Sequence, residues 1–173
     1  DPSALQMWVH WISNKSILGG LLGGTFAVEL AKKYLKIQVS SGDLFVYPII
    51  VGMILGRIGC FTQGVFDGTH GNPTDVPWAM DMGDGIPRHP AQLYEILFLY
   101  VCWGVLKMLE SKLASGAHFK IFMLSYLVFR FVAEWIKPVH FDYLGFSAVQ
   151  VACLLGFVYY APSFLRPKSL FAK

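Results

Sequence analysis

Apolar residues along the chain gather into five long segments, separated by short polar connections and by one long connection. Each segment approaches the about 20 residues that a helix needs to cross a hydrocarbon layer roughly 30 Å thick. The pattern therefore predicts an all-α integral membrane protein of about five transmembrane helices, forming a single transmembrane domain over residues 1–173, with a large ordered extracytoplasmic loop. The expected spans are 17–34, 44–61, 92–109, 119–136 and 143–164, and the loop is 62–91.

The composition agrees with a bilayer as the solvent. Hydrophobic residues make up 55% of the chain and charged residues only 14%, and a soluble domain of this length lacks the polar surface to cover so much apolar area. The three cysteines have no CxxC spacing and no matching pair of histidines, which argues against a disulfide framework and a zinc site. We expect no metal, no cofactor and no nucleic-acid partner.

The charges on the connections predict the orientation. Basic residues follow the first and fifth spans and bracket the junction of the third and fourth, whereas the loop is acidic. By the positive-inside rule the basic sides and the C-terminus are cytoplasmic, and the loop is outside. The basic residues are Lys32, Lys33, Lys36, Lys107, Lys112, Lys120, Arg166, Lys168 and Lys173, and the charged loop residues are Asp67, Asp75, Asp81 and Asp84 against Arg88.

The loop itself is rich in Gly, Asp, Asn and Pro, which are turn-forming residues. We expect a compact ordered cap that lacks regular secondary structure. It contains no ligands at EF-hand or zinc spacing, so the loop adds no reason to expect a metal.

Arg57 lies deep in the second apolar segment. A central membrane arginine costs about 2.5 to 3.5 kcal/mol on insertion scales, so its presence needs a reason. One interpretation is that the side chain snorkels to the outer interface, about one turn away. The other is that the guanidinium binds an anion at the outer end of the bundle.

The fourth segment carries Tyr126, Arg130 and Glu134 at four-residue spacing, which places them on one helix face. This stripe is expected to face the bundle interior. It is consistent with an internal salt bridge that orders the helices. It is equally consistent with a phosphate-diester receptor, in which Arg57 and Arg130 bind oxygens bidentately while a tyrosine and a carboxylate orient one guanidinium.

The loop runs into the third span through Arg88 and His89, held near the membrane surface by neighbouring prolines. His89 has a reference pKa near neutrality and is a candidate for proton transfer, although a structural histidine fits the pattern as well. Gln92, Tyr94 and Glu95 follow at the helix start, either as ordinary helix-start groups or as partners of the arginines.

Several short motifs follow one another from the second span to the start of the third. They are Gly56-Arg57-Ile58-Gly59 with Phe61, then Gly64 and Gly68, then Pro73-Thr74-Asp75-Val76-Pro77-Trp78, then Arg88-His89-Pro90 with Gln92-Leu93-Tyr94-Glu95. Together they resemble the signature region of bacterial prolipoprotein diacylglyceryl transferases. The resemblance covers most of the chain, and the chain looks like a member lacking the first two of the family's seven spans, so that the native protein is expected to begin earlier.

The resemblance implies a bacterial inner-membrane enzyme that moves diacylglycerol from phosphatidylglycerol to the lipobox cysteine of a secreted lipoprotein precursor. The partners it implies are a phosphatidylglycerol-like phospholipid, a lipoprotein precursor peptide and the bilayer. Arg57 and Arg130 would hold and polarise the lipid phosphate. His89 would be a further catalytic group. The implied substrate-binding residues are Tyr126, Glu134, Arg88, Gln92, Tyr94, Glu95, Gly68 and Cys60.

Three positions depart from the family pattern. Cys60 stands where the family usually has Asn, Val65 where it has Glu, and Leu18 where it often has His. Two alternatives to the transferase follow from these changes. One is a non-catalytic relative that binds an anionic lipid or a lipoprotein precursor, and the other is a different phospholipid-processing transferase that uses the same phosphate site. Cys60 is a candidate nucleophile or a packing residue.

Overall fold

A computed structural model describes residues 17–138, 145–165 and 170–171, and the chain divides into two units, Asp1–Val39 and Ser40–Lys173. In the first unit the described element is helix α2, Ile17–Leu35. The expected single domain stays a prediction. The basic residues expected after the fifth span, Arg166, Lys168 and Lys173, lie outside the described residues.

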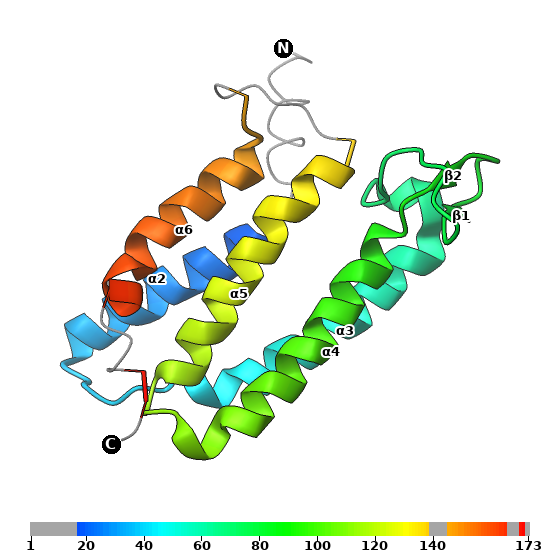
Figure 1. Cartoon of the computed structure of the whole chain (residues 1–173). Helices are drawn as coiled ribbons and strands as arrows, with labels where there is room; N and C mark the ends of the chain where they lie inside the picture. Colours follow the sequence, from blue (N-terminus) through cyan, green and yellow to red (C-terminus); the bar gives the residue numbers. More distant parts are fainter. Residues whose placement is uncertain (1–16, 139–144, 166–169, 172–173) are drawn as a thin grey trace, which may run out of the picture. The chain divides into compact units, whose positions relative to one another are not determined.

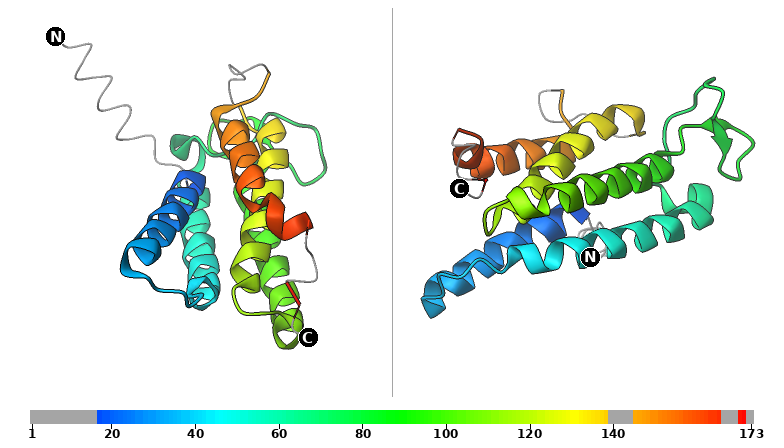
Figure 2. Two further views of the ribbon diagram at one scale, coloured as in Figure 1. Left: turned by 90° about the vertical axis from the view of Figure 1, so that its left-hand side faces the viewer. Right: turned by 60° about the horizontal axis from the view of Figure 1, so that its bottom comes forward.

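The second unit is built mainly from helices (Figure 1). Helix α3 packs against α4, and α5 packs against α6, with further contacts between α4 and α5. The three views agree that α3 and α4 run side by side, as do α5 and α6 (Figure 2). The helical elements are η1 Gly42–Phe45, α3 Val46–Gln63, η2 Gly64–Asp67, α4 Ala91–Leu109, η3 Glu110–Lys112, α5 Ala117–Ala133, η4 Glu134–Ile136 and α6 Ala148–Leu165.

The first four helices start and end close to the limits that the hydrophobic pattern predicted. The fifth differs, because α6 begins only at Ala148. Gly145 has a φ of 84°, outside the helical region, and Ser147 caps the helix from its non-helical side. The expected start at residues 143 and 144 lies outside the described residues.

Two helical segments in the described chain are long and apolar enough to cross a membrane, Gly42–Asp67 with 26 residues and Ala91–Lys112 with 22. Ala148–Pro162 is apolar but shorter. Their outward faces carry large hydrophobic side chains such as Leu55, Leu97 and Val158, which are 63%, 64% and 73% exposed. Helices with apolar outer faces are typical of proteins whose surroundings are lipid.

The loop after α3 does contain regular structure, so the expectation of a cap without it was wrong. Strand β1, Met80–Asp81, pairs antiparallel with β2, Pro87–Arg88. The turn between them is held by Asp81, whose Oδ1 accepts hydrogen bonds from the backbone N–H groups of Gly83, Asp84 and Gly85. This local side-chain bonding favours a hairpin in a segment too polar to show a strand pattern.

Backbone hydrogen bonds tie the loop to two helix ends. Gly71 N–H donates to the His89 carbonyl at 3.0 Å, and His89 N–H donates to the Asn72 carbonyl at 3.1 Å. Asn72 N–H in turn donates to the Ile136 carbonyl at 2.7 Å. The loop is therefore fixed between the start of α4 and the end of η4.

Asp43 caps the opposite end of α5. Its carboxylate accepts hydrogen bonds from the backbone N–H groups of Gly116, at 2.5 Å, and Phe119, at 3.0 Å. A carboxylate at a helix N-terminus satisfies donors that have no partner within the helix and interacts favourably with the helix dipole.

We expect Asp43→Ala to lower the free energy of unfolding by about 1 kcal/mol, the usual cost of a lost helix cap. The measurement is SDS-induced unfolding of the full-length protein in mixed micelles, followed by circular dichroism. Asp75→Ala is the control, because Asp75 is exposed and no contact recorded for the described residues involves it. Equal stability of the two variants would contradict the capping role.

Candidate functional site

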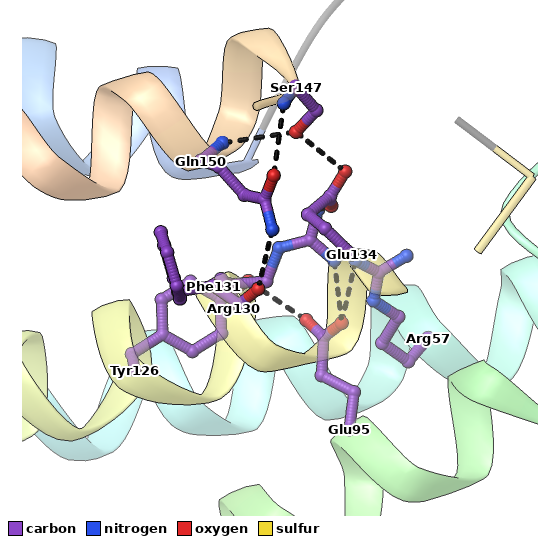
Figure 3. A network of polar contacts seen from close by, with 8 residues as sticks. All are labelled: Arg57, Glu95, Tyr126, Arg130, Phe131, Glu134, Ser147 and Gln150. Carbon is purple, nitrogen blue, oxygen red and sulfur yellow. Dashed lines mark hydrogen bonds and ion pairs between the residues drawn. The ribbon is translucent and has the colours of Figure 1, made fainter. Parts of the chain in front are cut away.

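Glu95 of α4 lies between two arginines from neighbouring helices (Figure 3). Its Oε2 is 2.8 Å from Arg57 Nη2, on α3, and 3.7 Å from Arg130 Nη1, on α5. All three side chains are buried, with 1%, 5% and 8% exposure for Glu95, Arg57 and Arg130. The two arginines that the sequence singled out are thus brought to one carboxylate.

The stripe on α5 contributes two more groups. Arg130 Nη2 donates to Glu134 Oε1 at 2.7 Å, as the four-residue spacing predicted. The recorded hydrogen bond of the Tyr126 hydroxyl is to Glu95, with donation to Oε1 at 2.9 Å. Both Glu95 oxygens therefore have partners, and the carboxylate is fixed in one orientation. Arg57 does not snorkel, since its side chain is paired inside the helix bundle.

The network continues into α6 through two residues that the sequence reasoning missed (Figure 3). Ser147 Oγ donates to Glu134 Oε2 at 3.2 Å and accepts the Gln150 N–H at 3.1 Å. Gln150 Oε1 accepts the Ser147 N–H at 3.0 Å, and Gln150 Nε2 donates to the Phe131 carbonyl. Ser147 and Gln150 form a capping box, and the signal for it was Ser-x-x-Gln ahead of an apolar run.

His89 and Tyr94 lie together at the start of α4. Trp78 Nε1 donates to the Tyr94 hydroxyl at 2.7 Å, and His89 Nδ1 is 3.1 Å from the same oxygen. The indole can only donate, and the Tyr94 oxygen has a second lone pair, so this oxygen can also accept from His89 in the tautomer that carries its proton on Nδ1. This arrangement leaves His89 Nε2 as the nitrogen without a partner among these groups.

Two other expected site residues, both in the loop, have environments of their own. Arg88 bonds to Asp84 in the hairpin at 2.6 Å, and these hydrogen bonds hold the pKa of Asp84 below its usual value. Gly68 ends η2 with a φ of 66°, which favours glycine. Neither residue has a recorded contact with the arginine pair.

Gln92 and Cys60 lie on the helices that carry the central groups. The buried Gln92 side chain donates to Thr69 Oγ1 at 3.4 Å, while its Oε1 has no hydrogen-bond partner. Cys60 Sγ is 4.0 Å from Arg57 Nη1, one turn along α3. The thiol therefore lies beside the Arg57 guanidinium.

The centre has donor capacity that the described residues do not use. Arg57 Nε and Arg130 Nη1 are buried without a hydrogen-bond partner. Unsatisfied buried donors are costly, and guanidinium groups match phosphate or carboxylate oxygens. The site can thus receive an anion. In the described part of the chain, no group of three or more His, Cys, Asp or Glu residues is arranged to hold a metal.

The chain matches the model of the family described as prolipoprotein diacylglyceryl transferase over residues 3–165. A phosphatidylglycerol–prolipoprotein diacylglyceryl transferase of Bordetella parapertussis is 36% identical over 154 residues, 86% of this chain and 57% of the relative. The protein of the same name from Nitratidesulfovibrio vulgaris strain Miyazaki F is 38% identical, over 83% of this chain and 57% of the relative.

A third relative with this name, from Methylococcus capsulatus, is 32% identical over 96% of this chain and 67% of its own length. No solved structure matches the chain. The chain spans a little over half the length of the first relatives, at 57%. The match to the family model covers nearly the whole chain, and the residues Arg57, Glu95 and Arg130 lie within it. The chain therefore belongs to the prolipoprotein diacylglyceryl transferase family.

Proposed function

We propose that this chain carries the phosphate-binding and catalytic centre of a transferase that moves diacylglycerol from phosphatidylglycerol to the cysteine thiol of a lipoprotein precursor. The names of the relatives support the substrates. The observation that carries the proposal is the pair of buried arginines held by Glu95, with Arg57 Nε and Arg130 Nη1 left without a hydrogen-bond partner among the described residues.

In the proposed reaction Arg57 and Arg130 hold the phosphodiester of the donor lipid. The precursor's thiolate attacks the diacylglycerol carbon bonded to the phosphate oxygen. A C–S bond forms, the C–O bond breaks, and glycerol phosphate leaves with the electron pair. The guanidinium groups stabilise the negative charge that grows on the leaving phosphate, which is a pre-organised electrostatic contribution.

His89 is the group that we assign to the thiol proton. Its Nδ1 is occupied by Tyr94, and Tyr94 is held by Trp78, so the ring has a fixed orientation. Nε2 is then the nitrogen that can accept a proton from the incoming thiol. In the same scheme Gln92, beside Thr69, contacts the substrates, as do the loop residues Arg88 and Gly68.

We further propose a multi-pass arrangement of about five spans in a bacterial inner membrane, with the loop 62–91 outside and the C-terminus in the cytoplasm. The lysines near the ends of α2, α4 and α5 and the aspartates of the loop support this orientation. The arginine pair then faces the outer leaflet, from which a secreted precursor is reached.

A second candidate function is a non-catalytic relative that binds the anionic lipid or the precursor. The proximity of Cys60 to Arg57 favours it, because a thiol stands beside the phosphate-binding guanidinium where the family usually has an amide. The two candidates differ in one outcome. A transferase forms thioether product, whereas the binding protein retains the lipid without turnover.

Arg57→Lys is expected to lower the rate of thioether formation about 100-fold or more, since it keeps the charge but removes the planar fork. The measurement is transfer of labelled diacylglycerol from phosphatidylglycerol to a lipobox peptide by the full-length protein in nanodiscs. Arg130→Lys should behave alike. Arg57→Ala would leave Glu95 without its closest cation, and is expected to destabilise the protein as well.

Cys102→Ala is the control for these variants, because Cys102 is a buried α4 residue whose role is packing. It is expected to be nearly silent in the transfer assay. If Arg57→Lys and Arg130→Lys were each as active in the transfer assay as the control Cys102→Ala, the proposed phosphate site would be wrong. Retained lipid binding with no product in the wild type would select the binding-protein alternative.

Ser147→Ala is expected to lower kcat about tenfold with a smaller change in KM, because Glu134 loses the donor that orients it against Arg130. Ser147→Thr keeps a hydroxyl and should recover activity. Gln150→Leu is the matched control: it breaks the capping box and leaves the Ser147–Glu134 contact in place. If Gln150→Leu and Ser147→Ala lose activity equally, Ser147 acts through helix stability alone.

A further inference from the structure

Lys137 is a buried cation that neither the motifs nor the reaction scheme uses. It directly follows η4 and is 8% exposed, as buried as Arg130. The pKa of Lys137 is lowered to about 8, chiefly by burial and also by Arg130 and Arg57, with Glu95 and Glu134 acting in the opposite direction. The ammonium group therefore lies in the field of the same four charged groups that form the site.

The charges of this cluster do not balance. Arg57 is paired with Glu95, and Arg130 with Glu134, while no ion pair recorded for the described residues includes Lys137. Among the described residues, three cations thus stand against two carboxylates. A buried charge without a counter-ion is costly, and at membrane depth or at its edge it is a candidate for a functional site. A ligand with one negative charge would balance these described groups.

Backbone contacts hold Lys137 in this place. Its N–H donates to the Glu134 carbonyl at 3.3 Å, and the preceding carbonyl, of Ile136, accepts the Asn72 N–H. Asn72 Nδ2 also donates to the Trp135 carbonyl. The loop thereby fixes the two residues that precede Lys137.

We propose that Lys137 is the residue by which the site selects a lipid whose phosphodiester headgroup carries a net negative charge. This inference rests on the proposed phosphate-binding function. A glycerol headgroup leaves the phosphodiester at one negative charge, which neutralises the surplus cation. An ethanolamine headgroup adds its own ammonium, which would be repelled by Lys137 and leave the surplus in place.

The test is displacement of fluorescent phosphatidylglycerol from the full-length protein in detergent micelles, by unlabelled phosphatidylglycerol or phosphatidylethanolamine. Lys137→Met is expected to weaken phosphatidylglycerol binding about tenfold or more and to leave phosphatidylethanolamine binding nearly unchanged, so the preference is lost. Lys137→Arg should keep it. Lys120→Met removes an exposed lysine of α5 and should change nothing.

The outcomes separate the inference from the function on which it rests. In one outcome the wild type prefers phosphatidylglycerol, Arg57→Lys abolishes this binding, and Lys137→Met keeps the preference. The proposed role of Lys137 is then wrong, while the phosphate site stands. If the wild type does not bind phosphatidylglycerol, both fall. Thermal melting checks that Lys137→Met is folded, and Lys137→Gln replaces it in the same comparison if it is not.

Discussion

The placement of Glu95 between two buried arginines is the constraint on which the rest of the second unit depends. A guanidinium in an apolar bundle is tolerated only with a counter-ion at close range, because removal of one partner from a buried pair costs about 3 to 5 kcal/mol. Arg57, Glu95 and Arg130 come from three different helices. Their pairing therefore requires α3, α4 and α5 to lie next to one another, with the three charged residues at the same level along the helices.

The same pairing links helix packing to site geometry. Glu95 is oriented by Tyr126 on one oxygen and by the arginines on the other. Arg130 is oriented by Glu134, and Glu134 by Ser147 at the start of α6. A shift of α6 relative to α5 would thus move the guanidinium that is proposed to hold the phosphate. Interactions that stabilise the bundle and interactions that orient the site are here the same hydrogen bonds.

Whether a contact could be predicted from the sequence depends on how far apart its residues lie along the chain. The apolar segments predicted the ends of four helices to within about three residues, and the spacing of Arg130 and Glu134 predicted their ion pair, because both signals are local. For Glu95 the sequence left two roles open, a helix-start group or a partner of the arginines, and the structure shows the second. Nothing in the sequence near Glu95 shows that Tyr126 donates to it, since that contact joins two helices 31 residues apart along the chain.

The loop shows the same limit. Its turn residues indicated an ordered segment but not the hairpin, which depends on one aspartate accepting three backbone N–H groups. The start of α6 was misplaced because the apolar run continues across Gly145, whereas the capping box at Ser147 sets the actual boundary. The capping residues Ser147 and Gln150 are present in the sequence, but the predicted helix start was based on the apolar run alone.

The way the loop is attached bears on how proton transfer and phosphate binding can be combined. Gly71 has no room for a side chain, since a Cβ there would overlap the Cβ of His89 and lie 2.6 Å from the His89 carbonyl oxygen and 3.0 Å from that of Ile136. The backbone of His89 is therefore held against the end of the helical segment that carries Arg130 and Glu134. The backbone of the proposed base is positioned by hydrogen bonds to the backbone of Gly71 and Asn72. A reaction that needs a thiol and a phosphodiester in fixed relative positions is favoured by this kind of rigid attachment, because the entropy of bringing the groups together is lost on folding and not during catalysis.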